Sequence, residues 1–170
     1  NSFFILIISV TIFSCIDNSN TLFFQIDSKT SNVKFNNQII ENDTLNILNE
    51  EYVFNGGGVA AADFDNDGKT DLFFTGNQQP NRIYLNQGDF VFKDISESAK
   101  ILAQDKWSTG VTYVDINNDN LIDIYVCAAM HKNNRDNMLF INKGVDPQTG
   151  IISFEEKASE YGIDDSGNSM

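Results

Sequence analysis

The sequence is poor in histidine, cysteine and proline, and these shortages exclude several classes of protein. Its 170 residues contain one histidine, two cysteines and two prolines. Two cysteines are too few for a disulfide scaffold. The single histidine, His131, has no cysteine or histidine nearby in the sequence. The chain also contains no Ser/His/Asp set, phosphate-binding glycine loop or dinucleotide fingerprint. We therefore expect no catalytic residues in this chain and predict that it is not an enzyme.

Basic residues are also scarce, and this excludes two classes of partner. Lys and Arg number 11 against 24 Asp and Glu, which gives a formal net charge of −13. A nucleic-acid binder needs a basic surface to displace counterions from phosphate, so we expect no nucleic-acid partner. An anionic membrane surface is excluded for the same reason. A hydrophobic content of 41% with 14 phenylalanines is too high for a disordered acidic tail.

The N-terminal segment has the character of an export signal. Residues 3–16 are uncharged and mostly apolar, but they are fewer than the roughly 20 that a membrane-spanning helix needs. The run fits the apolar region of a signal peptide. It ends in Ile12-Phe13-Ser14-Cys15, which resembles a bacterial lipobox and predicts lipidation of Cys15. An ordinary signal peptide or a buried N-terminal strand remains an alternative.

Two stretches of the chain repeat each other. Asp63–Leu72 and Asp115–Ile124 lie 52 residues apart, and a Gly-Val pair precedes each at the same distance. Residues 81–88 and 137–144 also match, with a spacing of 56. Such repeats indicate an array of similar structural units. We expect the chain to be a piece of a longer repeat protein.

Each repeat reads as four short strands, rich in Val, Ile, Leu, Phe and Tyr and bounded by Asp, Asn and Gly. Four antiparallel strands in about 50 residues are typical of one β-propeller blade. The sequence therefore predicts an all-β fold, a propeller fragment of about two four-stranded blades. The expected strands are 58–62, 72–76, 82–86 and 90–94, and then 111–114, 124–128, 138–142 and 152–155. Residues 97–107 should connect the blades, with room for a helical turn.

These patterns divide the chain into six segments. Val33–Phe35 and Tyr52–Phe54 are further strand candidates, and one of them could close a propeller ring. The expected segments are a signal peptide with lipobox (1–15), a linker (16–21), an N-terminal lead-in (22–57), a first blade (58–109), a second blade (110–167) and the start of a third (168–170).

The two acidic loops carry the chemistry that the sequence suggests. Counted from Asp63 and Asp115, positions 1, 3, 5 and 9 bear side-chain oxygens, and position 7 would offer a backbone carbonyl. An all-oxygen, charge-rich set suits Ca²⁺, whereas zinc prefers His and Cys. The predicted ligands of two calcium sites are Asp63, Asp65, Asp67, Lys69 (backbone) and Asp71, and Asp115, Asn117, Asp119, Leu121 (backbone) and Asp123.

The two acidic loops allow two other interpretations. An EF-hand needs Glu at position 12, but Phe74 and Val126 stand there, so the loops are not EF-hands. Ordinary solvated turns are the simpler alternative, because Asp-Gly and Asn-Asp are common turn residues. Position 6 needs a left-handed backbone, which Gly68 and Asn120 can adopt.

The repeats resemble the FG-GAP or VCBS family, the blades of integrin α-subunit propellers and of many secreted bacterial proteins. The stretch Gly58–Leu72 carries its motif, and residues 81–88 look like bacterial VCBS proteins that end in an ASPIC/UnbV domain. The resemblance implies a calcium-bound propeller of about seven blades, active in adhesion or ligand binding. Asn117 departs from the motif and should weaken the second site.

The function expected from these observations is binding, not catalysis. We predict a calcium-stabilised module that binds a protein or glycan ligand at the bacterial cell envelope, in an outer-membrane or cell-surface lipoprotein. Membrane contact would be only through the lipid on Cys15; a periplasmic or secreted protein is the alternative. Another alternative is a scaffold within a larger, polysaccharide-related surface enzyme. Trp107 could stack on a sugar or pack between blades, and Cys127 could be a buried thiol or pair with Cys15.

Overall fold

The structure of the chain is a computed structural model that describes residues 22–130, 134–167 and 169. The predicted signal peptide, the linker and His131 lie outside the described residues. In the described parts of the chain, no helix is long and apolar enough to cross a membrane.

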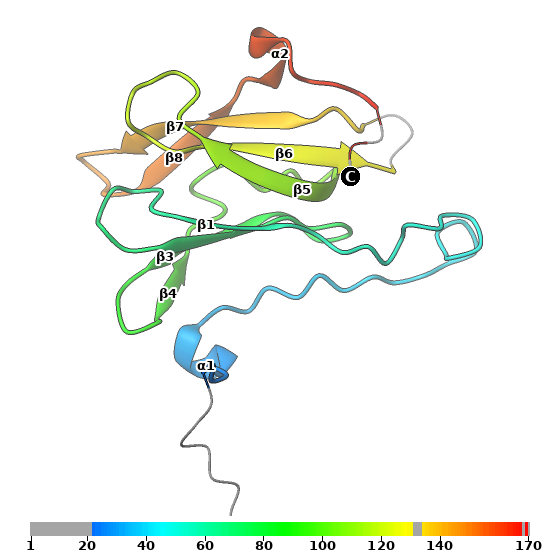
Figure 1. Cartoon of the computed structure of the whole chain (residues 1–170), viewed down its shortest axis with the longest axis horizontal. Helices are drawn as coiled ribbons and strands as arrows, with labels where there is room; N and C mark the ends of the chain where they lie inside the picture. The colour runs from blue at the N-terminus through cyan, green and yellow to red at the C-terminus, as the bar shows by residue number, and fades with distance from the viewer. Residues whose placement is uncertain (1–21, 131–133, 168, 170) are drawn as a thin grey trace, which may run out of the picture.

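Two antiparallel sheets of four strands each form the body of the protein, stacked one above the other (Figure 1). In each sheet the strands follow one another in chain order. The all-β prediction of about two four-stranded propeller blades is confirmed. The first sheet contains β1 (Val59–Ala62), β2 (Asp71–Phe74), β3 (Arg82–Asn86) and β4 (Phe92–Asp94), and the second contains β5 (Trp107–Val114), β6 (Asp123–Ala129), β7 (Met138–Val145) and β8 (Ile152–Glu156).

The main core lies between the two sheets. Strand residues alternate between the two faces of a sheet, so Phe73 and Ile83 of the first sheet turn toward Ile124 and Val126 of the second. Phe64, which follows β1, joins the same core and is fully buried. Its ring meets that of Phe154 in β8 edge to face, with 6.5 Å between the ring centres. One apolar layer therefore holds the two repeats together.

The chain just before β1 lies very close to β5. The backbone N–H of Gly58 donates to the carbonyl of Thr109 at 2.7 Å. A Cβ on Gly58 would lie 2.9 Å from the backbone nitrogen of Val111, which is too close for any side chain. The glycine that marks the start of the first repeat is therefore required by the neighbouring repeat.

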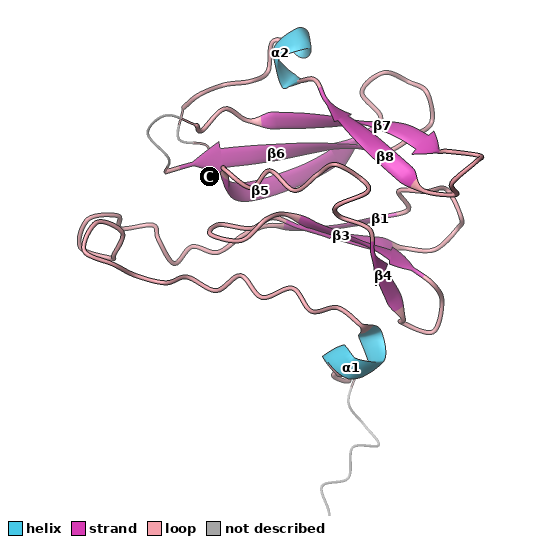
Figure 2. Cartoon of the chain, turned by 180° about the vertical axis from the view of Figure 1, so that it is seen from behind, coloured by secondary structure: helices cyan, strands magenta, loops and turns pink. Residues whose placement is uncertain are grey.

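The lead-in covers the outer face of the first sheet, the face turned away from the second sheet (Figure 2). It contains one short helix, α1 (Ser28–Ser31), and is otherwise irregular. The ring of Phe35 stacks on that of Phe74 at 5.1 Å. Neither Val33–Phe35 nor Tyr52–Phe54 is a strand, so that prediction is wrong. Side-chain stacking and amide hydrogen bonds hold the lead-in to the sheet in place of a backbone ladder.

The connections differ from the expectation in two details. β5 begins at Trp107, so the boundary predicted between Thr109 and Gly110 falls inside this strand, where its pairing with β6 is interrupted between Ser108 and Val111. Residues 96–100 form turns and no helix, while the matching stretch after β8 contains α2 (Ala158–Tyr161).

The packing of Phe64 leads to a prediction about stability. Phe64→Ala should lower the free energy of unfolding by about 3–5 kcal/mol, because it opens a cavity between the sheets. Ile116 occupies the same loop position in the second repeat but is 38% exposed, so Ile116→Ala should cost about 1 kcal/mol or less. Urea unfolding measures both. Equal losses would contradict the role of Phe64 in joining the repeats.

Candidate metal sites in two acidic loops

The two acidic loops lie at the same end of the stacked sheets (Figure 1). One connects β1 to β2, and the other connects β5 to β6. They also touch, because Nδ2 of Asn66 donates to the carbonyl of Asn120 at 3.1 Å. Any ligand bound to one loop would therefore lie close to the other repeat.

The first loop is folded around its own carboxylates. The Asp63 carboxylate accepts the backbone N–H groups of Asp67 at 3.1 Å and Gly68 at 2.8 Å. Oδ1 of Asp65 accepts the same Asp67 N–H at 3.2 Å. These bonds turn the side chains at positions 1 and 3 into the loop, as the spacing of the motif predicts.

The second loop repeats this pattern bond for bond. The Asp115 carboxylate accepts from the N–H groups of Asp119 at 3.1 Å and Asn120 at 2.8 Å. Oδ1 of Asn117 accepts the Asp119 N–H at 3.1 Å. Two loops of different composition reach the same conformation, so the acidic positions set the shape of the loop.

Positions 4 and 6 of both loops have a left-handed backbone. At position 6, Gly68 has φ of 85° and Asn120 has φ of 66°, which confirms the expectation for this position. Asn66 and Asn118 at position 4 have φ of 59° and 61°. The left-handed backbone at position 4 was not predicted, although asparagine adopts this conformation more readily than most residues.

The aspartates at position 9 clamp each loop to its sheet. The buried Asp71 carboxylate accepts the N–H of Phe64 at 2.9 Å and of Asn86 at 2.8 Å. Asp123 does the same with Ile116 at 3.0 Å and Asn142 at 2.8 Å. Each oxygen keeps a second lone pair after these bonds, so Asp71 and Asp123 could also bind a metal ion.

Burial makes the charge on these aspartates costly. It raises the pKa of Asp71 to about 6, against the effect of its two backbone N–H donors, and the charges of Asp65 and Asp67 raise it further. Burial also raises the pKa of Asp123 and of Asp65. A carboxylate with a raised pKa is one whose charged form the protein disfavours unless a cation is near.

Three of the predicted ligands of the first loop come together. Carboxylate oxygens of Asp63, Asp65 and Asp71 all lie within 4.8 Å of one another. Ca²⁺ binds oxygen at 2.3–2.6 Å, so ligands that share one ion lie no more than about 5 Å apart. The donor set of this loop fits calcium in both chemistry and spacing.

Asp67 does not join that group. Its carboxylate accepts the backbone N–H of Lys69 at 2.9 Å and also binds the Lys69 ammonium. This contact lowers the pKa of Asp67 and places a positive charge at the edge of the cluster. Asp67 could serve a metal only by exchanging this partner.

The second loop has a weaker set of donors. Asn117 replaces the aspartate at position 3, and its Nδ2 donates to the Asp119 carboxylate at 2.9 Å. Asp115, Asp119 and Asp123 do not form a close carboxylate trio in the described structure. Leu121 stands where the first loop has Lys69, so this loop also lacks the internal ammonium group.

The position 7 carbonyls are available in both loops. Within the described residues, the carbonyl oxygens of Lys69 and Leu121 accept no hydrogen bond outside the strand ladders. An open acceptor at this position agrees with the predicted backbone ligand.

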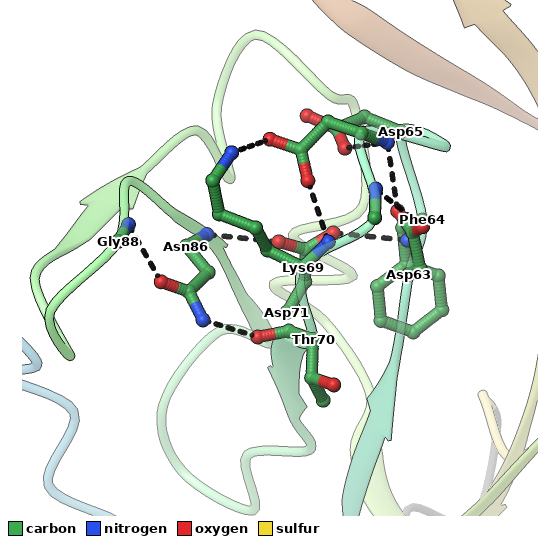
Figure 3. Close-up of polar contacts among 10 residues, drawn as sticks. Asp63, Phe64, Asp65, Lys69, Thr70, Asp71, Asn86 and Gly88 are labelled. Atoms are coloured by element: carbon green, nitrogen blue, oxygen red, sulfur yellow. Dashed lines mark hydrogen bonds and ion pairs between the residues drawn. The ribbon is translucent and has the colours of Figure 1, made fainter.

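Two asparagines that support the loops were missed from the sequence. Figure 3 shows Asn86 donating to the Thr70 carbonyl and accepting from the Gly88 N–H, both at 2.9 Å. Asn142 makes the same contacts with Ile122 and Gly144. Its Nδ2 also donates to the Phe64 carbonyl of the first loop at 2.8 Å. Their recurrence in the matched segments 81–88 and 137–144 was the available signal.

Trp107 and Cys127 have no part in the loops. Trp107 is only 3% exposed and packs with Val53 and Ala129, which favours the packing role over sugar stacking. Cys127 is a half-buried free thiol.

Comparison with known proteins supports the repeat. Residues 63–126 match the family model of the FG-GAP-like repeat, a span that contains both acidic loops. Cartilage acidic protein 1 of Xenopus tropicalis is 27% identical to this chain over 100 residues, which are 59% of the chain and 15% of that protein. The chain therefore spans a small part of the relative that it matches.

The contacts of Asn142 predict an unequal effect of two matched substitutions. Asn142→Ala should destabilise the protein by about 2–4 kcal/mol, because buried carbonyls in both repeats and the Gly144 N–H lose their partners. Asn86→Ala breaks contacts within one repeat only and should cost about half as much. Urea unfolding of both variants tests this. A larger loss for Asn86→Ala would contradict the assigned contacts.

Proposed function

We propose that this chain is part of a calcium-stabilised β-propeller module that binds a protein or glycan ligand and has no catalytic role. The observation that carries the proposal is the pair of acidic loops, which share one hydrogen-bond pattern and gather three carboxylates in the first copy. The FG-GAP-like repeat across both loops supports it. Such repeats often bind calcium and are typically structural or adhesive modules.

Calcium would act here on stability. Asp63, Asp65 and Asp71 would hold the ion in the first loop, together with the Lys69 carbonyl. Asp115, Asn117, Asp119 and Asp123 with the Leu121 carbonyl would form the second site. Carboxylates crowded at 4 Å repel by about 1 kcal/mol per pair in water and more where water is excluded. A bound cation removes this repulsion. Since it binds only the folded loop, it shifts the folding equilibrium by about 2.7 kcal/mol per site at 100 times its dissociation constant.

We further propose that the module is exported and works at the cell envelope. The apolar residues 3–16 and Cys15 support this from the sequence alone. In this proposal the lipid on Cys15 provides the membrane contact. The narrower likeness to bacterial VCBS proteins of the ASPIC/UnbV type belongs to the same proposal and rests on residues 81–88.

A reciprocal exchange at position 3 tests the calcium sites. Asp65→Asn keeps the oxygen that accepts the Asp67 N–H, as Asn117 does for Asp119, so it removes charge without removing the turn. It should weaken calcium binding by about tenfold, because Ca²⁺ affinity follows the number of charged ligands. Asn117→Asp should strengthen the second site by a similar factor.

Calorimetric titration measures the calcium affinity of both variants. Thermal unfolding in EDTA and in millimolar calcium measures the effect of calcium on Tm. Calcium should raise the Tm of the original chain by several degrees. No rise in Tm and no heat of binding would show that the loops are solvated turns and would reject the proposal.

The lipid anchor gives a separate prediction. In a bacterial host fed an alkyne-tagged fatty acid, the exported chain should incorporate the tag, and Cys15→Ser should abolish it. Cys127→Ser should leave labelling unchanged, because Cys127 lies inside the second sheet. Equal labelling of the Cys15→Ser variant would contradict lipidation at Cys15.

A further inference from the structure

The two acidic loops differ at two positions whose effects on charge are opposite. At position 3 the first loop has Asp65 where the second has Asn117, and at position 7 it has Lys69 where the second has Leu121. Four carboxylates and one ammonium group give the first loop a formal charge of −3. Three carboxylates without an ammonium group give the second loop the same charge. The additional carboxylate of the first loop is therefore matched by its lysine.

The side chain of Lys69 lies at the carboxylate cluster of the first loop. Its ammonium group bonds to the carboxylate of Asp67, two residues earlier. This hydrogen bond raises the pKa of Lys69 against the opposing effect of desolvation, and the charges of Asp67, Asp65 and Asp71 raise it further. The ammonium group therefore acts on Asp65 and Asp71, two of the three carboxylates that could share an ion.

Leu121 has no comparable role in the second loop. It lies beside Gly144 near the end of β7, where a Cβ on that glycine would come within 3.4 Å of Leu121 Cδ1. The Asp119 carboxylate accepts from Nδ2 of Asn117 and from the Leu121 N–H, both at 2.9 Å. These neutral donors orient the carboxylate but leave its charge in place. Of the two loops, only the first contains its own cation.

An ammonium group and a calcium ion are attracted by the same carboxylates. Carboxylates crowded at one site repel one another unless a cation is near, and Lys69 supplies such a cation on a flexible side chain. A divalent ion held by Asp63, Asp65 and Asp71 would be repelled by the same ammonium group. Lys69 therefore favours the loop without calcium over the loop with calcium.

We propose that Lys69 is an internal counter-ion that sets the calcium concentration at which the first loop fills. Without calcium, its ammonium group offsets part of the repulsion among the carboxylates. With calcium, it competes for Asp67 and repels the ion, so filling needs more calcium than the oxygen ligands alone would require. The proposal deepens the calcium function proposed above and rests on it.

Two measurements on the full chain test this role, with calcium chloride as the ligand. Thermal unfolding in EDTA reports the stability of the metal-free loops. Calcium titration followed by NMR of the backbone N–H groups of Gly68 and Asn120 reports each affinity separately, because each group donates to the first carboxylate of its own loop.

Lys69→Leu gives the first loop the residue found in the second. It should raise the calcium affinity measured at Gly68 about tenfold, because the repulsion between a divalent ion and an ammonium group a few ångströms away corresponds to about that factor in water. It should also lower the Tm in EDTA by about 2–4 °C, because the metal-free carboxylates lose their counter-ion.

A double variant and a matched control make the result specific to the loop. Asp65→Asn combined with Lys69→Leu removes one charge of each sign, so its first loop should bind calcium within about threefold of the original affinity. Lys157 also pairs with a carboxylate, that of Glu160 at 2.9 Å, but it follows β8 and lies outside both loops. Lys157→Leu should leave the calcium affinity of both loops unchanged.

Opposite changes with and without calcium distinguish a counter-ion from an ordinary surface ion pair. A lower Tm in EDTA with an unchanged calcium affinity in Lys69→Leu would overturn the proposal, and so would a double variant that binds as weakly as Asp65→Asn alone. When the original chain binds calcium, either result rejects the role of Lys69 and leaves the calcium sites intact. No calcium response at Gly68 or Asn120 in any variant rejects the calcium sites and this proposal together.

Discussion

The structure depends on the bonds between the position 9 carboxylates and the backbone N–H groups around them. Asp71 and Asp123 each join the start of an acidic loop to the third strand of their sheet. Such charge-assisted bonds are stronger than neutral ones, but they require a charged group at a buried position. A cation bound between Asp71 and its neighbours would offset that requirement. Asp71 thus shapes the loop through its backbone bonds and belongs to the carboxylate cluster that could hold a metal ion.

The two repeats are alike in hydrogen bonding and unlike in charge. Positions 1, 3 and 5 accept the same backbone N–H groups in both loops, yet the first loop has an additional carboxylate and an internal lysine. The turn therefore forms with either Asp or Asn at position 3. The affinity for a cation, in contrast, should be lower with Asn. The contact of Asn142 with Phe64 ties the second repeat to the first loop, so a change in the conformation of the first loop bears on the packing of both sheets.

Local repetition explains why much of the fold could be predicted from the sequence. The matching segments predicted the same four strands in both repeats, and Gly68 and Asn120 at position 6 predicted a left-handed backbone. The lead-in could not be predicted, because its conformation comes from contacts such as Phe35 with Phe74 and Asn37 with Asn77, which are distant in sequence. The partner of Asp67 was also missed, since the spacing of ligands does not show that a neighbouring lysine competes with a metal.

The two repeats differ in what covers their apolar side chains. The lead-in covers the outer face of the first sheet, whereas the second repeat leaves Tyr113, Val114 and Ile116 substantially exposed. Phe64, the counterpart of Ile116, is fully buried by the repeat that follows it. The side chain at loop position 2 is therefore covered where another repeat follows, as Phe64 is by the second repeat, and Ile116 is left partly exposed where the described residues contain no further repeat.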